Sequence, residues 1–306
     1  MTTVVVFGGT GFLGRRLVQR LTAEGATVRV AVRNADPVRS ALGATGLNQV
    51  TVFRADVRDQ TSVAAAMAGA DAVVNAVSAY VEKGDVTFEA VHVQGAELVA
   101  REAGRLGVAR LVLISGLGAD PQSRSPYIRS RGRGELAVQQ AFPGATIVRP
   151  SAMFGPGDAL FGTLANLARL LPVLPLIGGG RTRLQPVYVE DVAEAVTRIL
   201  ADPGTVGRIY ELAGPEVYTL RDLVRLTLRV IGKRRLLMPV PFAVAEIQAR
   251  LFEFLPSPPL TTGQVDLLKT DNVARGTLPG FPELNFLPKA VGEVVPTYIG
   301  RSPSGV

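Results

Sequence analysis

The amino-acid sequence predicts an α/β protein built on a Rossmann-type, doubly wound parallel sheet with a smaller C-terminal lobe. First, an apolar run at residues 4–7 leads directly into four closely spaced glycines and then into a helical pattern. Second, strand-like and helical runs alternate through the first half of the chain, as they do in parallel sheets covered on both faces. Third, the chain has 306 residues, of which 47% are hydrophobic, which suffices for one large domain or for a domain with a cap.

The segment after the first predicted strand has the spacing of a phosphate-binding turn. Residues 9–14 read Gly-Thr-Gly-Phe-Leu-Gly and fit G-x-G-x-x-G, while Gly8, Gly11 and Gly14 fit the wider G-x-x-G-x-x-G. Such glycines allow a tight turn, a close approach of the backbone to pyrophosphate, and close helix–strand contact. The helix N-terminus that follows favours anions. The alternative is a tight strand-to-helix turn without a ligand. We expect a dinucleotide to bind at Gly8, Thr10, Gly11, Phe12, Leu13, Gly14 and Arg15.

The other elements follow in order from apolar runs and helical periodicity. Strands are predicted at residues 27–32, 50–53, 72–76, 111–115, 146–149, 187–189 and 209–213. Helices are predicted at residues 37–42, 60–68, 86–105, 129–141, 191–201 (capped by Asp191) and 220–231 (after Thr219). Residues 154–180, rich in Gly and Pro, predict loops, and 278–306 an irregular wrap. We expect a dinucleotide-binding domain at 1–150, rejoined by 185–202, and a smaller substrate or partner lobe with a C-terminal tail at 151–306.

Ligands of such sheets bind beyond the carboxyl ends of the strands, so the residues that follow each strand are candidates. Arg33 stands 19 residues after Gly14, where an NAD-specific site carries Asp or Glu. A guanidinium there can bind a 2′-phosphate, so NADP(H) is the preferred cofactor and NAD(H) the alternative; Arg33 is otherwise a solvated strand end. The third and fourth strands are followed by further candidate cofactor contacts at Asp56, Val57, Asn75, Ala76 and Val77.

Composition excludes several function classes. The sequence has no cysteine and one histidine, His92, so we expect neither a metal site nor a His-based nucleophilic triad. The net charge is +7, but the basic residues are spread out without aromatic interleaving, so we expect no nucleic-acid partner. There is no run of 18 apolar residues and no predicted leader. We expect a cytoplasmic protein, or one peripheral on the cytoplasmic face of the inner membrane (the matrix side if mitochondrial).

Together these motifs resemble the extended or atypical branch of the short-chain dehydrogenase/reductase superfamily. The resemblance covers roughly residues 1–220 and includes the glycine turn, Asp56-Val57, Ile114-Ser115-Gly116, residues 149–156 beginning Arg-Pro-Ser, and residues 185–192. It implies a catalytic Ser, a Tyr that exchanges a proton with the substrate oxygen, and a Lys four residues later that holds the nicotinamide ribose. The matching residues here are Ser115, Tyr127 and Arg131, with Pro150 beside the cofactor.

Arg131 departs from the family pattern, because a planar guanidinium replaces the point charge of a lysine. The chain has only four lysines among its 33 basic residues, so Arg substituting for Lys throughout is one explanation, and lost dehydrogenase activity is another. The alternative for Tyr127 is an exposed residue that follows Pro126 at a helix start, with no part in chemistry.

A closer resemblance connects the chain to the dehydrogenase-like accessory subunits of respiratory complex I and their bacterial homologues. It is carried by residues 125–135, Phe142-Pro143, Arg149-Pro150-Ser151, Leu171-Pro172, residues 186–192 and the stretch 239–259. This resemblance implies tightly held NADPH with a structural or redox-sensing role and a protein complex as partner. The alternative is an active NADP-dependent oxidoreductase or nucleotide-sugar epimerase/dehydratase on a small substrate, with Tyr127 as the acid/base.

Residues 233–255 form a second candidate contact surface. A basic segment, Lys233-Arg234-Arg235, precedes an amphipathic helical pattern at 242–255, an arrangement that suits peripheral membrane contact. An ordinary helix packed on the lobe is the alternative.

Overall fold

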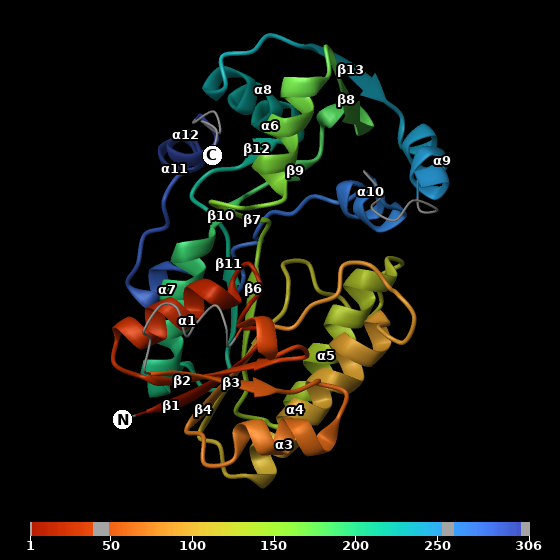
Figure 1. Ribbon diagram of the computed structural model, residues 1–306. Helices are drawn as coiled ribbons and strands as arrows, with labels where there is room; N and C mark the ends of the chain where they lie inside the picture. The colour runs from red at the N-terminus through yellow and green to blue at the C-terminus, as the bar shows by residue number, and fades with distance from the viewer. Residues whose placement is uncertain (1, 39–48, 253–259, 301–306) are drawn as a thin grey trace. The chain divides into compact units, whose positions relative to one another are not determined.

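The computed structural model describes residues 2–38, 49–252 and 260–300, and the chain forms two compact units (Figure 1). Unit 1 comprises Met1–Pro150, Val189–Leu212 and Gly276–Phe286; unit 2 comprises Ser151–Tyr188, Ala213–Arg275 and Leu287–Val306. Assignment of the two parts as a dinucleotide-binding domain and a substrate or partner lobe stays a prediction.

Unit 1 is organised around a seven-stranded parallel sheet in the order β11-β6-β5-β4-β1-β2-β3 (Figure 1). The strands are β1 (Thr3–Phe7), β2 (Thr27–Val32), β3 (Val50–Arg54), β4 (Ala72–Asn75), β5 (Arg110–Ile114), β6 (Thr146–Pro150) and β11 (Ile209–Leu212). The apolar, β-branched runs of its central strands are buried on both faces, as a covered parallel sheet requires. The order reverses between β1 and β4, which places the switch point beside the glycine turn. The predicted Rossmann-type fold is confirmed.

Helices cover both faces of this sheet (Figure 1). The helices α1 (Gly14–Ala23) and α7 (Val189–Ala201) pack together on one face, and α3 (Gln60–Met67), α4 (Ala96–Arg105) and α5 (Pro126–Ala141) on the other. Val63, Val99 and Val138 of the second group pack against strand residues such as Val73 in one buried cluster. The first face buries Leu17 of α1 and Val196 of α7.

The predicted helix at 86–105 differs in part from the structure. Residues Glu89–Gly95 form a π-helical segment, η1, and only Ala96–Arg105 are α-helical. This segment lies against α5 at very short range, because a Cβ on Gly134 would be 1.9 Å from the carbonyl oxygen of His92. Close packing of α5 on η1 therefore depends on a glycine, and π-helical turns are frequent at functional sites.

In unit 2, helices pack around three two-stranded sheets. The strands β7 (Met153–Phe154) and β10 (Val187–Tyr188) pair in parallel, as do β8 (Val173–Ile177) and β13 (Leu236–Val240), while β9 (Arg183–Leu184) and β12 (Tyr218–Thr219) are antiparallel. The longer helices are α6 (Leu160–Leu170), α8 (Leu220–Val230) and α9 (Phe242–Phe252). The shorter ones are α10 (Thr262–Leu268), α11 (Val291–Val294) and α12 (Pro296–Ile299).

Three predictions for the second half of the chain were wrong in detail. Residues 154–180 are not only loops, since Phe161, Ala165 and Ala168 form the buried face of α6 and β8 follows it. Asp191 does not cap α7, which begins at Val189, so Asp191 is buried within its first turn. Residues 278–300 are not wholly irregular, because α11 and α12 pack Val295 and Ile299 into a core cluster. By contrast, the amphipathic pattern predicted from residue 242 is confirmed over its described residues by α9 (Phe242–Phe252), with β13 lying between it and the basic segment Lys233-Arg234-Arg235.

The structure tests the helices predicted at 220–231, 37–42 and 242–255 only over the residues that it describes. Thr219 caps α8, and its side chain accepts a hydrogen bond from the backbone N–H of Asp222 in a reciprocal capping box. Residues 39–42 and 253–255, which completed two predicted helices, lie outside the described residues. Within the described part of the chain, no helix is long and apolar enough to cross a membrane.

Candidate dinucleotide-binding site

Three glycines shape the turn after β1, each for a different physical reason. Gly8 has a φ of +75°, and a Cβ there would lie 2.9 Å from the carbonyl oxygen of Ala76. A Cβ on Gly14 would lie 2.1 Å from the carbonyl oxygen of Gly8. Around Gly11 the nearest atom to a Cβ, the same Gly8 oxygen, is 3.2 Å away, and no other described atom lies within 4 Å. Gly8 and Gly14 are thus needed to close the turn, whereas Gly11 leaves space above the backbone.

The space beside Gly11 is lined by hydrogen-bond donors of the backbone. Thr10 and Gly11 are exposed. α1 begins at Gly14, and the first of its N–H groups that donate are those of Arg15, to the Gly11 carbonyl, and of Arg16 and Leu17, to the Leu13 carbonyl. Among the described residues, the N–H groups of Phe12 and Leu13 have no hydrogen-bond acceptor. Unused N–H groups at a helix start, with its positive dipole end, suit an anionic phosphate, so the turn fits the group that its spacing predicts.

Arg16 positions this turn. Its side chain is buried, whereas Arg15 beside it is exposed. Its guanidinium donates to the carbonyl oxygen of Phe12 at 3.1 Å and to Glu190 at 3.3 Å, and lies 4.8 Å from the centre of the Phe12 ring. Glu190 is 174 residues away in the sequence, so local periodicity carried no signal for this contact.

The candidates after β2 and β3 are placed differently from one another. Arg33 directly follows β2 and is exposed. The carboxylate of Asp56 accepts from Arg58 Nε at 2.9 Å and from Nη2 at 2.6 Å, and this pair holds the pKa of Asp56 below its usual value. Val57 is buried in the main core cluster. Arg33 therefore remains accessible to a ligand, while the Asp56 side chain is engaged by Arg58.

The candidates after β4 line the sheet beside the glycine turn. Asn75 is buried, and its Oδ1 accepts from the Val77 N–H at 3.2 Å. The Ala76 N–H donates to the Phe7 carbonyl at 3.0 Å, and the Ala76 carbonyl faces Gly8. These contacts fix a flat backbone surface at the switch point.

The predicted catalytic residues lie at the ends of β5 and α5. Arg131 is buried on α5, where its Nη1 donates to the Ile114 carbonyl at 3.1 Å and its Nη2 donates to the Tyr127 hydroxyl at 3.3 Å. Nη2 also donates to Ser78 Oγ. Burial lowers the pKa of Arg131, but the hydroxyls of Tyr127 and Tyr80 outweigh it and raise the value overall, so the guanidinium stays charged.

Ser115 immediately follows β5 and is buried, but its Oγ has no hydrogen-bond partner within the described residues. Arg131 Nε is likewise buried without a partner in this part of the chain. Unmet buried polar groups are costly unless a ligand or water satisfies them. The structure thus brings Tyr127 and Arg131 together, while Ser115 makes no bond to Tyr127. Pro150, at the end of β6, accepts from the Leu117 N–H at 2.9 Å.

His92 packs against Tyr127, a contact that the sequence did not predict. Its Nε2 accepts from the Ala79 N–H at 3.0 Å, and its Nδ1 bonds Ser130 Oγ at 2.9 Å; Ser130 in turn donates to the Tyr127 carbonyl. The His92 ring packs edge-on against the Tyr127 ring, with 5.5 Å between centroids. Because Nε2 is an acceptor, the imidazole is neutral with its proton on Nδ1.

Burial and the charge of Arg131 lower the pKa of His92 from 6.5 to about 3. Between these values the unfolded chain binds the proton and the folded chain does not, so stability rises with pH. We expect the free energy of unfolding to fall by about 1.6 kcal/mol from pH 6.5 to pH 5, measured by urea unfolding. His92 is the chain's one histidine, so His92→Gln should remove most of this slope; an unchanged slope in that variant would contradict the neutral, buried imidazole.

Parallel strands in this order, with a glycine turn at the switch point, define an NAD-binding Rossmann fold. Residues 4–213 match the model of the NAD dependent epimerase/dehydratase family. The chain belongs to this family, as the resemblance to the extended short-chain dehydrogenases predicted.

Curated relatives include both a respiratory subunit and a reductase. The chain is 37% identical over 297 residues to NADH dehydrogenase (ubiquinone) 1 alpha subcomplex subunit 9, mitochondrial, of Arabidopsis thaliana, covering 92% of this chain and 73% of the relative. It is 34% identical over 240 residues to the ceramide reductase of Caulobacter vibrioides, covering 78% of this chain and 73% of the relative. Among solved structures, the UDP-glucose 4-epimerase of Thermus thermophilus in complex with NAD has a TM-score of 0.64 at 25% identity, covering 78% of this chain and 86% of that one.

Proposed function

We propose that this chain holds NADP(H) in unit 1 and acts as an accessory or redox-sensing subunit of an assembly related to respiratory complex I. The observation that carries the proposal is that the Arg131 side chain is already hydrogen-bonded to other groups of the protein. Its two terminal nitrogens are bound to Ile114, Ser78 and Tyr127, so the guanidinium that stands in for the family lysine serves the protein's own packing. The similarity to the plant complex I subunit supports the choice of partner.

The proposed binding site follows from the geometry of unit 1. The pyrophosphate would lie on the turn at Gly8, Gly11 and Gly14, and Ser115, Tyr127 and Arg131 would border the nicotinamide end. Nicotinamide cofactors such as NADP(H) supply hydride-transfer chemistry when bound. In the proposed site, these residues of the chain would hold and orient the cofactor.

The proposed preference for NADP(H) rests on Arg33, which is exposed at the end of β2. We expect Arg33→Asp to weaken NADPH binding about tenfold to a hundredfold, since a hydrogen-bonded charge contributes about 1.5–3 kcal/mol, and to leave NADH binding equal or stronger. Fluorescence titration of both nucleotides measures this. Arg101→Asp, at an exposed position on α4, is the matched control. Equal losses for both nucleotides would contradict a role for Arg33 in selectivity.

The test of the proposed function begins with protein isolated from its native cells without added nucleotide. We expect extraction to release NADPH that survives dialysis and is not oxidised by trial carbonyl or quinone substrates, and the protein to co-purify with a membrane respiratory complex. Loss of that partner on removing NADPH would identify the sensing form of the role. An empty site, or a protein that never co-purifies with such a complex, would overturn the proposal.

We also propose peripheral membrane contact through residues 233–255. In the described part of this stretch, α9 buries Ala245 and Ala249 and exposes Ile247 and Leu251, so it has one packed face and one apolar face open to a partner.

A second candidate function is favoured by the unpaired Ser115 hydroxyl and by the 3.3 Å contact between Tyr127 and Arg131. With these, Tyr127 would exchange a proton with a substrate oxygen while Ser115 orients it, as in a reductase or epimerase; the similarity to a ceramide reductase supports the reductase form. If so, Tyr127→Phe should lower substrate-dependent NADPH oxidation at least about a hundredfold, with NADPH binding changed less than about threefold. A turnover rate equal to wild type would remove Tyr127 from the chemistry.

A further inference from the structure

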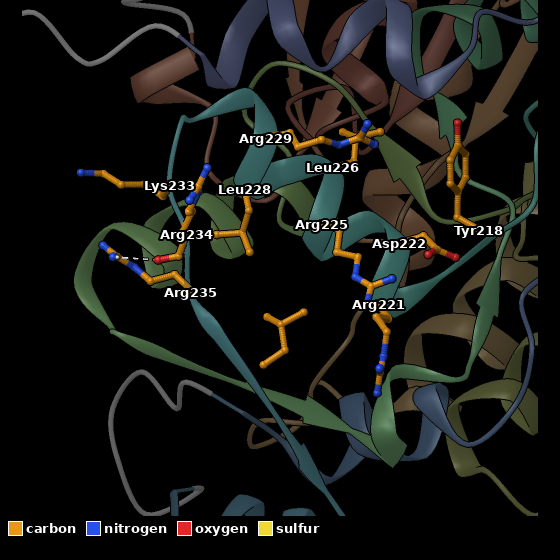
Figure 2. Close-up of a pocket in the computed structure, with 11 residues that line it drawn as sticks. Tyr218, Arg221, Asp222, Arg225, Leu226, Leu228, Arg229, Lys233, Arg234 and Arg235 are labelled. Carbon is orange, nitrogen blue, oxygen red and sulfur yellow. Dashed lines mark hydrogen bonds between the residues drawn. The ribbon is translucent and has the colours of Figure 1, made fainter.

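Unit 2 contains a cationic hollow, about 670 Å³ in volume, that the dinucleotide site does not use. Figure 2 shows Arg221, Arg225 and Arg229 on α8 along one side and Lys233, Arg234 and Arg235 from the α8–β13 segment along the other. The hollow is also lined by Leu226, Leu228 and Leu237. Asp222 is the one carboxylate among the lining residues.

The arginines of α8 are spaced four residues apart, which places them on one face of the helix. Like charges at this spacing destabilise a helix, so the arrangement costs folding stability in the absence of an anion. Some other arginines of the described chain are neutralised by a carboxylate: Arg149 pairs with Glu135 at 2.6 Å and Arg183 with Asp271 at 2.7 Å.

In the hollow, neutralisation by the protein is slight. Arg221 donates to the Gly179 carbonyl and Arg235 to the Ala168 carbonyl, which fixes their positions and leaves their charges. Within the described residues, Arg225, Arg229, Lys233 and Arg234 form no ion pair, and all four are exposed. The hollow is thus a local concentration of positive charge, in which two of the six cations are held in place by backbone carbonyls, and it suits several phosphates at once.

Exposed apolar side chains follow these cations along the chain. β13 exposes Leu236 and Met238, which are 68% and 52% accessible, on the strand face opposite to Leu237, which lines the hollow. α9 exposes Ile247. Basic residues flanked by exposed apolar ones are typical of proteins that lie on anionic lipid surfaces, where cations attract headgroups and apolar side chains enter the interface. The link to a lipid surface is the chain segment itself: Lys233, Arg234 and Arg235 of the hollow belong to the same stretch as α9, whose exposed Ile247 and Leu251 form the proposed membrane contact.

We propose that this hollow binds the phosphates of anionic lipid headgroups at a membrane surface. The inference rests on the membrane contact proposed for residues 233–255, but it adds α8 to the contact, because the headgroup site combines Lys233, Arg234 and Arg235 with Arg221, Arg225 and Arg229 outside that stretch. It does not depend on NADP(H).

The test is co-sedimentation of the full chain with vesicles of phosphatidylcholine containing phosphatidylglycerol, compared with phosphatidylcholine alone. We expect binding only to the anionic vesicles. The variant R225Q/R229Q, outside residues 233–255, should lower the affinity at least about tenfold, and adding K233Q/R234Q should lower it further. The matched control R101Q/R124Q removes two exposed arginines of unit 1 and should change the affinity less than about twofold.

The outcomes separate the two proposals. If R225Q/R229Q binds like wild type while Ile247→Gln/Leu251→Gln loses binding, the hollow is not the headgroup site and the contact through 233–255 stands. If wild type ignores anionic vesicles, both fail. An equal loss in the control shows a net-charge effect and overturns the hollow. Inorganic pyrophosphate is the soluble probe, and the variant R225Q/R229Q separates the hollow from the glycine turn. If R225Q/R229Q loses pyrophosphate binding but binds anionic vesicles like wild type, the hollow serves a soluble phosphate and the lipid assignment is overturned.

Discussion

Gly11→Asp is expected to abolish retention of the dinucleotide while leaving unit 1 folded. The backbone at Gly11 does not require a positive φ, and a Cβ there meets only the Gly8 carbonyl oxygen, at 3.2 Å, among the described atoms. The carboxylate would lie near the N–H groups of Phe12 and Leu13, which have no acceptor among the residues that the structure describes and where a phosphate is expected. Competition for these donors and repulsion between like charges together should weaken binding at least a hundredfold, about 2.7 kcal/mol or more.

The measurement is nucleotide content after purification, followed by titration with NADPH. Gly292→Asp is the matched control, because it adds the same charge where a Cβ would meet open space. It should retain nucleotide like the unchanged chain. Urea unfolding of both variants separates a lost ligand from a lost fold. Normal retention by Gly11→Asp would remove the glycine turn from the binding site.

Gly134→Ala is expected to be strongly destabilising, in contrast to most glycine-to-alanine changes in helices. A Cβ at Gly134 would lie 1.9 Å from the His92 carbonyl oxygen, so α5 must move away from η1. We expect the free energy of unfolding to fall by about 3 kcal/mol or more, at the upper end for overpacked sites. Since Tyr127 and Arg131 are on α5, the displacement should also weaken nucleotide binding.

The same substitution at another glycine, Gly104→Ala in α4, is expected to have the opposite effect on the free energy of unfolding. Its nearest non-local atoms lie 3.8 Å away, on Ala141 and Phe142, so the added methyl fits and the variant should gain up to about 1 kcal/mol from helix propensity. Chemical unfolding of the two variants side by side measures the difference. Equal effects would show that the contact between Gly134 and His92 does not limit how closely α5 packs.

Features that depend on neighbouring residues were predictable from the sequence. The buried strands needed only their apolar runs, and the start of α8 needed only Thr219 and the Asp three residues later. The close approaches at Gly8 and Gly14 follow from the motif that contains them. The Arg at position 131 was visible as a departure from the family lysine, but its partners Ile114 and Ser78 were not.

Features that depend on distant partners were not predictable. The burial of Arg16 follows from Glu190, and the neutral state of His92 follows from its depth, Ala79 and Arg131. No local pattern encodes such pairs. α6 was missed for another reason: glycines and prolines around it obscured the spacing of Phe161, Ala165 and Ala168, which decides the helix.

Unit 1 is assembled from three separate stretches of the chain, and this has a consequence for its folding during synthesis on the ribosome. After β6 emerges, its outer edge has no neighbour until β11 pairs with it, and residues 151–208 must be made in between. The Glu211 N–H of β11 can donate to the Pro279 carbonyl only after residue 279 has also been made. A nascent chain arrested between these points exposes an unpaired parallel strand, the kind of edge that recruits chaperones or aggregates. Translation speed across residues 151–208 therefore sets how long the growing chain is at risk.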